Sequence, residues 1–172
     1  TLEEDVDFGV LTKGRIIVAP NNETRQNDCT YWDLILWNEG VEYDNVGNFT
    51  GTGDKLTFKL YTDVIQQNDD NEYYIPDGTY TVVPGPETEG HDFAAGEIAG
   101  GVWGYSHPQF PSGAWYIRME NDVATGDACI KEGTMTVARS GETYDIIFAF
   151  ISDAGYKVTG KYEGVFDNIH AQ

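Results

Sequence analysis

The chain has 172 residues, which suits one domain, and 40% of them are hydrophobic, enough for a packed core. Its 29 acidic and ten basic residues give a formal net charge of −19, and a field of that sign repels nucleic-acid phosphates and anionic membrane surfaces. No apolar run approaches the roughly 18 residues of a membrane-spanning helix. We therefore expect no nucleic acid as partner and no transmembrane segment.

The first half of the chain contains segments in which apolar and polar side chains alternate with a period of two, as half-buried strands require. These predicted strands cover residues 15–18, 30–37, 56–60 and 80–82. In residues 30–37, Trp32, Leu34 and Leu36 share one face, and further aromatic side chains lie on the other. Aromatic residues on both faces indicate a central strand, or one covered on its outer side.

Residues 84–114 are irregular, since they hold four of the six prolines, with one short strand candidate at 98–103. Alternation resumes at 115–120, which predicts another strand. The densest pattern follows at 129–166, where three strands are joined by tight turns at Ser140-Gly141 and at 153–155. Glycines 160 and 164 inside the last of these strands indicate a bulge, a bend or a close backbone approach.

Apolar residues nowhere recur with helical spacing over three turns, so we predict little helix. Eight to ten short strands predict an all-β fold, an antiparallel β-sandwich or flattened β-barrel. Because no linker or strict repeat divides the chain, residues 1–172 are expected to form a single domain.

The two cysteines, Cys29 and Cys129, lie 100 positions apart. A single disulfide would suit an exported protein and two buried thiols would suit the sequence equally, so both possibilities stay open. No CxxC pair occurs, and histidines 91, 107 and 170 stand singly, so the sequence gives no support to a zinc or other transition-metal centre. We expect no cofactor.

The acidic stretch at 68–72 offers side-chain oxygens for calcium, but it lacks the spacing of a calcium-binding loop and is interpreted as a solvated turn. Neither a GxSxG elbow nor a GxxxxGK[ST] phosphate loop is present. With 29 acidic residues, some pair of carboxylates always meets glycosidase spacing, so such a pair carries no information. Binding is therefore favoured over catalysis.

Large aromatic residues interleaved with Gly and Pro at 100–116 are the best functional candidates. We predict that Trp103, Tyr105, Trp115 and Tyr116 bind a ligand, because exposed rings can stack on the C–H faces of sugars. The alternative is that Trp103 and Trp115 plug an end of the hydrophobic core, since large aromatic side chains are mostly buried.

Two stretches carry a resemblance to a known group of proteins. Residues 51–83 include GTGDKLTFKLYTD and IPDGTYTV, and residues 130–166 include GTMTV, YDIIF and VTGKYEG. This pattern resembles the small all-β lipoproteins and cell-surface modules of gut Bacteroidetes, most of which have no assigned function. The resemblance implies export to the periplasm or the outer cell surface. A lipid anchor, if present, would have to precede Thr1, because Cys29 lies beyond a predicted strand.

Taken together, these features predict an exported or cell-surface, non-catalytic binding module with a glycan as the favoured ligand. Two alternatives belong to other classes. One is a structural or adhesive surface subunit that binds protein partners, and the other, less favoured, is an enzyme that acts on glycans. The identity of the ligand and the oligomeric state stay open.

Overall fold

A computed structural model describes residues 1–20, 29–44, 46–65, 67–68, 72–85, 93–103, 111–166 and the backbone of 170–171. Within these ranges the chain forms strands and no helix, which confirms the all-β prediction. The strands are β1 (Val6–Leu11), β2 (Lys13–Ala19), β3 (Cys29–Trp37), β4 (Val41–Tyr43), β5 (Phe49–Gly51), β6 (Gly53–Asp63), β7 (Gly78–Val83), β8 (Glu97–Ala99), β9 (Val102–Trp103), β10 (Pro111–Ser112), β11 (Trp115–Glu120), β12 (Val123–Ser140), β13 (Thr143–Ser152), β14 (Lys157–Gly164) and β15 (His170–Ala171).

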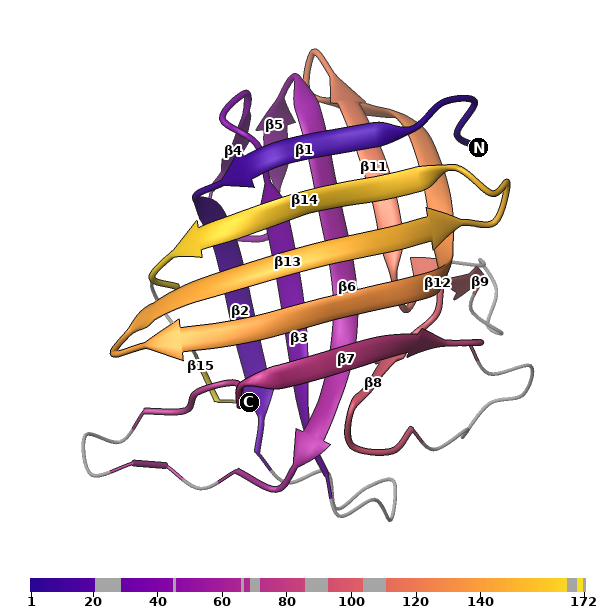
Figure 1. The fold of residues 1–172 in the computed structure, drawn as a ribbon. Helices are drawn as coiled ribbons and strands as arrows, with labels where there is room; N and C mark the ends of the chain where they lie inside the picture. Colours follow the sequence, from indigo (N-terminus) through magenta and orange to yellow (C-terminus); the bar gives the residue numbers. More distant parts are fainter. Residues whose placement is uncertain are drawn as a thin grey trace.

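The strands form two layers that cross at a steep angle (Figure 1). The front layer contains β1, β14, β13, β12 and β7, and the back layer contains β2, β3, β6 and β11. The main sheet runs in the order β1-β14-β13-β12-β7-β8-β6-β3-β2-β15. Because β11 pairs with both β12 and β6, strands β12, β7, β8, β6 and β11 close a ring. The fold is therefore a barrel flattened into a sandwich, as the sequence predicts.

Strand β12 joins the two layers. Its first half pairs with β11 in the back layer, and its second half pairs with β7 and β13 in the front layer. A register shift between Ile130 and Glu132 marks the bend. The next residue, Gly133, has a φ of 117°, and a Cβ there would lie 2.2 Å from the carbonyl oxygen of Ala149. A bulge that ends in glycine therefore lets one strand serve both layers.

The core lies between the layers and uses the faces that the alternation predicts. Trp32, Leu34 and Leu36 of β3 are fully buried, as are the apolar residues beside them on β6 and those of β13 in the other layer. Across the layers, the rings of Phe58 and Phe150 meet edge to face at 5.8 Å. Each layer thus contributes alternate side chains to one interior.

The structure differs from the sequence prediction at several short elements. The strand candidate at 98–103 is two strands, β8 and β9, interrupted at Gly100-Gly101. A Cβ on Gly101 would lie 2.3 Å from the carbonyl oxygen of Ala114 and 2.5 Å from the Cβ of Cys129, so the backbone passes too close for a side chain. Strands β1, β4, β5, β10 and β15 are not predicted from the sequence.

Cys29 and Cys129 are not joined by a disulfide; Cys29 is buried and Cys129 is half-buried. Burial is the main cause that raises the pKa of the Cys129 thiol. At the acidic stretch, the Glu72 backbone N–H donates to Asn68 Oδ1 at 2.9 Å, while residues 69–71 lie outside the described ranges. His91 and His107 also lie outside these ranges, and only the backbone of His170 is described. Among the described residues, no helix is long and apolar enough to cross a membrane.

Candidate functional site

The predicted aromatic residues separate into two environments. Trp103 is 49% exposed, whereas Trp115 and Tyr116 are buried at 3% and 1%. The Trp103 and Trp115 rings meet edge to face at 4.9 Å, and Trp115 Nε1 donates to the Ser112 carbonyl at 2.9 Å. Tyr105 lies outside the described residues.

Tyr116 points away from this pair because adjacent residues of a strand face opposite sides. Its ring meets Phe8 edge to face at 6.1 Å, and its hydroxyl donates to Asp54 Oδ1 at 2.5 Å. Burial and this contact raise the pKa of Tyr116. Of the three described candidates, Trp103 is therefore the one that presents a ring to solvent, and the ligand-binding role stays a prediction.

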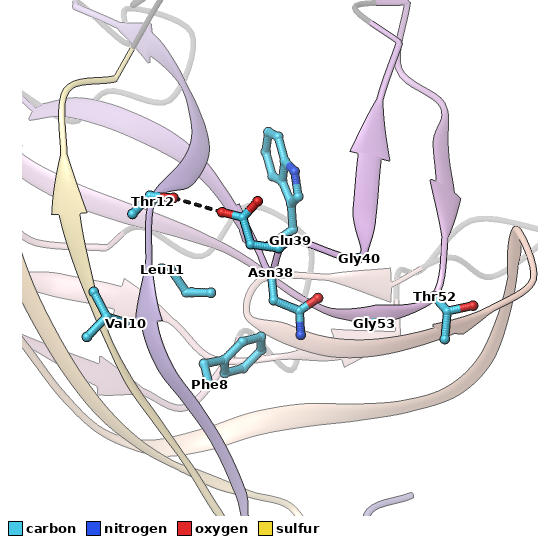
Figure 2. A pocket seen from close by; sticks show the side chains of 10 residues that line it. Phe8, Val10, Leu11, Thr12, Asn38, Glu39, Gly40, Thr52 and Gly53 are labelled. Carbon is cyan, nitrogen blue, oxygen red and sulfur yellow. Dashed lines mark hydrogen bonds between the residues drawn. The ribbon is translucent and has the colours of Figure 1, made fainter.

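An open pocket of about 390 Å³, which sequence reasoning did not single out, lies where the β1–β2 and β3–β4 connections meet the start of β6 (Figure 2). Its lining includes the apolar side chains of Phe8, Leu11 and Trp37. Thr12, Asn38 and Glu39 add a hydroxyl, an amide and a carboxylate. The pocket therefore combines ring and aliphatic walls with polar groups.

The turn that carries Asn38 and Glu39 is held by backbone pairing with the segment before β6. The Thr52 N–H donates to the Gly40 carbonyl at 2.9 Å, and the Asp54 N–H donates to Asn38 Oδ1 at 3.2 Å. A Cβ on Gly40 would lie 2.0 Å from the Thr52 carbonyl oxygen, so glycine is required for this approach. The one local sequence signal is Asn-Glu-Gly directly after a strong strand.

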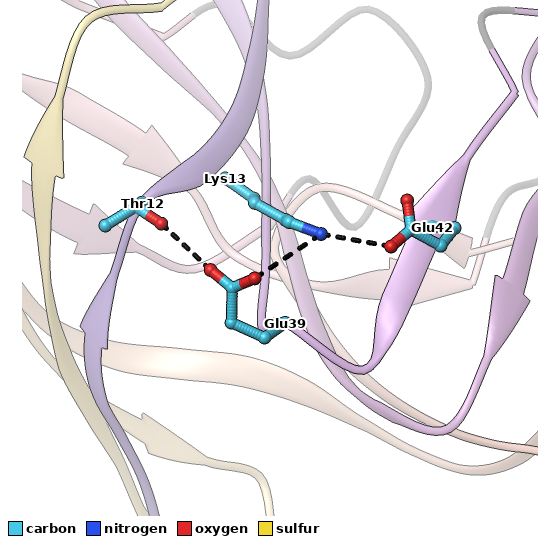
Figure 3. Close-up of polar contacts among 4 residues, drawn as sticks. All are labelled: Thr12, Lys13, Glu39 and Glu42. Carbon is cyan, nitrogen blue, oxygen red and sulfur yellow. Dashed lines mark hydrogen bonds and ion pairs between the residues drawn. The ribbon is translucent and has the colours of Figure 1, made fainter.

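A polar network lies at the rim of the pocket (Figure 3). The Thr12 hydroxyl donates to Glu39 Oε1 at 3.0 Å, and Lys13 Nζ lies 3.6 Å from Glu39 Oε2 and 3.2 Å from Glu42 Oε1. The hydrogen bond to Glu42 is the largest cause that raises the pKa of Lys13. The Glu39 carboxylate is thereby positioned, yet its side chain is 78% exposed and can accept further hydrogen bonds.

Aromatic rings and cations continue from the pocket onto the outer face of the back layer. The β4–β5 hairpin packs on Trp37 with Tyr43 and Phe49, at ring distances of 5.9 and 5.3 Å. The Arg15 guanidinium lies 5.0 Å from the Tyr43 ring centre, and Lys55 Nζ lies 4.1 Å from that of Phe49. Burial lowers the pKa of Lys55.

This arrangement offers stacking surfaces, hydrogen-bonding groups and cations. In the part of the chain that the structure describes, no group of three or more His, Cys, Asp or Glu side chains could hold a metal ion. No family model, no curated protein and no solved structure matches this chain.

Proposed function

We propose that this chain is an exported, non-catalytic binding module whose ligand is a glycan. The observation that carries the proposal is the pocket of about 390 Å³ between the β1–β2 and β3–β4 connections. Sites for small ligands are concavities of several hundred Å³ with mostly apolar walls and a few placed polar groups. Sugars present C–H faces and hydroxyl groups together, which this mixture of rings, hydroxyl, amide and carboxylate suits.

The pocket groups are held before any ligand arrives. Thr12, Asn38 and Glu39 lie at strand ends or in a hydrogen-bonded turn, and Glu39 is positioned by Thr12 and Lys13. A binding site of this kind loses little conformational freedom when it is occupied, so more of the contact energy appears as affinity. The proposed export rests on the resemblance of residues 51–83 and 130–166 to surface modules.

The test is thermal unfolding of the full chain with a panel of host and plant glycans. A ligand at 100 times its Kd adds about 2.7 kcal/mol to the free energy of unfolding, which raises Tm by several degrees. For a glycan that shifts Tm, we expect Glu39→Gln to weaken binding about tenfold, because the acceptor oxygen loses its charge and the hydrogen bond to it becomes weaker.

Glu142→Gln is the matched control, since Glu142 is an exposed glutamate in the β12–β13 turn and does not line the pocket. It should leave affinity unchanged. If no glycan in the panel shifts Tm, the proposal fails, and a structural or protein-binding surface subunit becomes the better interpretation.

A further inference from the structure

Basic side chains gather on one surface of this acidic protein. Four of the ten Lys and Arg residues project from the outer face of the back layer, Lys13 and Arg15 from β2 and Lys55 and Lys59 from β6. These two strands flank β3, whose register aligns Lys13 with Trp37 and Lys55, and Arg15 with Ile35 and Thr57. The cations therefore lie in three adjacent rows across one sheet, with Lys13 and Lys55 in the first, Arg15 in the second and Lys59 in the third.

Within the described part of the chain, two of the four cations have carboxylate partners and two do not. Lys13 contacts Glu39 and Glu42, and Lys59 lies 3.8 Å from Asp33. Among the described residues, Arg15 and Lys55 form no ion pair. In a chain with almost three acidic residues for each basic one, two half-buried cations that pair with no carboxylate of the described residues are an unusual arrangement.

Arg15 and Lys55 contact aromatic rings. Arg15 lies over Tyr43 and donates from Nη1 to its hydroxyl, while Lys55 lies over Phe49. These contacts orient both side chains without neutralising them. The remaining N–H donors can therefore serve an anion that reaches the face.

The same rows of paired residues lead from the cations towards the exposed ring of Trp103. Thr57, in the Arg15 row, pairs with Trp115, on which Trp103 lies edge to face. Strands two positions apart are separated by about 10 Å, so Arg15, Lys55 and the aromatic residues lie within a few sugar rings of each other. A glycan on this face would meet stacking surfaces at both ends and cations between them.

The chemistry of the face selects the kind of anion. A net charge of −19 repels densely charged polyanions at long range, so only local attraction can hold an anionic group here. A carboxylate pairs with guanidinium through two parallel hydrogen bonds, and the sugar that bears it offers C–H faces to nearby rings. An isolated carboxylate on a sugar satisfies both requirements.

We propose that the outer face of β2, β3 and β6 binds the carboxylate-bearing sugar units of an acidic glycan, with Arg15 and Lys55 as the contacts to the carboxylates. This inference rests on the proposed function and names the ligand class of that module. It extends the binding surface from the pocket beside Trp37 onto the sheet.

The experiment measures the affinity of the full chain for oligogalacturonate, oligomannuronate, hyaluronan oligosaccharides and sialyllactose by calorimetry, each compared with its uncharged methyl ester. We expect an acid to bind at least tenfold more tightly than its ester. Added salt should weaken the binding of the acid and leave the binding of the ester unchanged. Lys55→Met removes the charge but keeps an apolar chain over Phe49. This variant and Arg15→Gln should each reduce the affinity for the acid about tenfold and leave the affinity for the ester unchanged.

Lys157→Met, at the start of β14 in the front layer, is the control and should leave both affinities unchanged. Equal binding of every acid and its ester overturns this inference. If Glu39→Gln still weakens glycan binding in that case, the proposed function stands and only the preference for acidic sugars is wrong. Self-association that Lys55→Met abolishes, without glycan binding, overturns the inference in favour of an acidic protein partner. If Lys55→Met no longer binds the acidic glycan while Glu39→Gln still does, the result supports the sheet face as the binding site and excludes the pocket as that site.

Discussion

Two tyrosine hydroxyls are held inside the barrel in their neutral form. Tyr80 donates to the Pro76 carbonyl at 2.7 Å, and Tyr144 accepts from the Ile75 N–H at 2.8 Å. Burial is the main cause that raises the pKa of each to about 12. Since an unfolded tyrosine titrates near pH 10, the fold favours the protonated phenol.

This preference predicts alkaline unfolding. A raised pKa in the folded state gives a contribution to stability that is complete below about pH 10 and is lost as the pH rises towards 12. Urea unfolding at stepped pH should show the free energy of unfolding falling across that window. Tyr80→Phe should flatten the fall, and an equally steep fall in this variant would contradict the assignment.

Gly160 lies where no side chain fits. A Cβ there would lie 2.6 Å from Phe148 Cζ and 2.9 Å from Phe8 Cβ, in the middle of the front layer. Gly160→Ala should therefore lower the free energy of unfolding by about 1–3 kcal/mol through overpacking. Gly126→Ala is the control, because its Cβ would meet Arg118 Cβ at an ordinary 3.8 Å. Similar urea midpoints for the two variants would rule out this explanation.

At the scale of elements, the β11–β12 turn is attached to the β5–β6 connection. Asn121 and Asp122 have φ values of 49° and 71°, the left-handed conformation of a two-residue hairpin turn. The Gly51 N–H donates to Asp122 Oδ1 at 2.6 Å, and the Asp122 N–H donates to the Gly51 carbonyl at 3.0 Å. One aspartate thus forms the turn and links it to a second hairpin.

Asp122→Ala should destabilise the protein by about 1–2 kcal/mol, because the side-chain acceptor and the tolerance of positive φ are lost together. Asp122→Asn keeps an acceptor oxygen and accepts the same backbone conformation, so it should lie close to the parent in urea unfolding. If both variants unfold at the same midpoint, the side-chain contact with Gly51 contributes nothing.

The long strands could be predicted from the sequence because their alternation is local. Residues 30–37 and 56–60 bury the faces that their pattern indicates, whereas the side of 115–120 that faces the main core is the one with Tyr116. At Gly160 the close neighbours are side chains, of Phe148 and Phe8, and no backbone approach is observed. Strand β1 was not predicted because its pairing with β14 is parallel and joins residues more than 150 positions apart. Hairpin strands of three residues, β4 and β5, are too short for a period to show.

The candidate site was less predictable, because its residues are not local in the sequence. The alternation of β11 already implies that Trp115 and Tyr116 face opposite sides, so both could not contact one ligand on one face. The pocket takes residues from 8–12, 37–40 and 52–53, which only the tertiary fold brings together. Likewise, the cations of β2 and β6 become neighbours through their common pairing with β3.

At the scale of the whole molecule, a net charge of −19 opposes the compact state through self-repulsion. Raising the ionic strength from about 0.01 M to about 0.15 M shortens the Debye length from about 30 to about 8 Å. We expect Tm to rise across this range. NaCl and KCl should act alike, since screening depends on ionic strength, and an unchanged Tm would show that the acidic groups are already well separated.

The parallel pairing of β1 with β14 also bears on how the chain acquires its structure. Val6 lies opposite Val158 and Leu11 opposite Tyr162, so this pairing cannot form until β14 has been synthesised. Contacts so distant along the chain slow folding, because a large loop must close before they contribute. We therefore expect β1 to join the edge of the front layer late in folding.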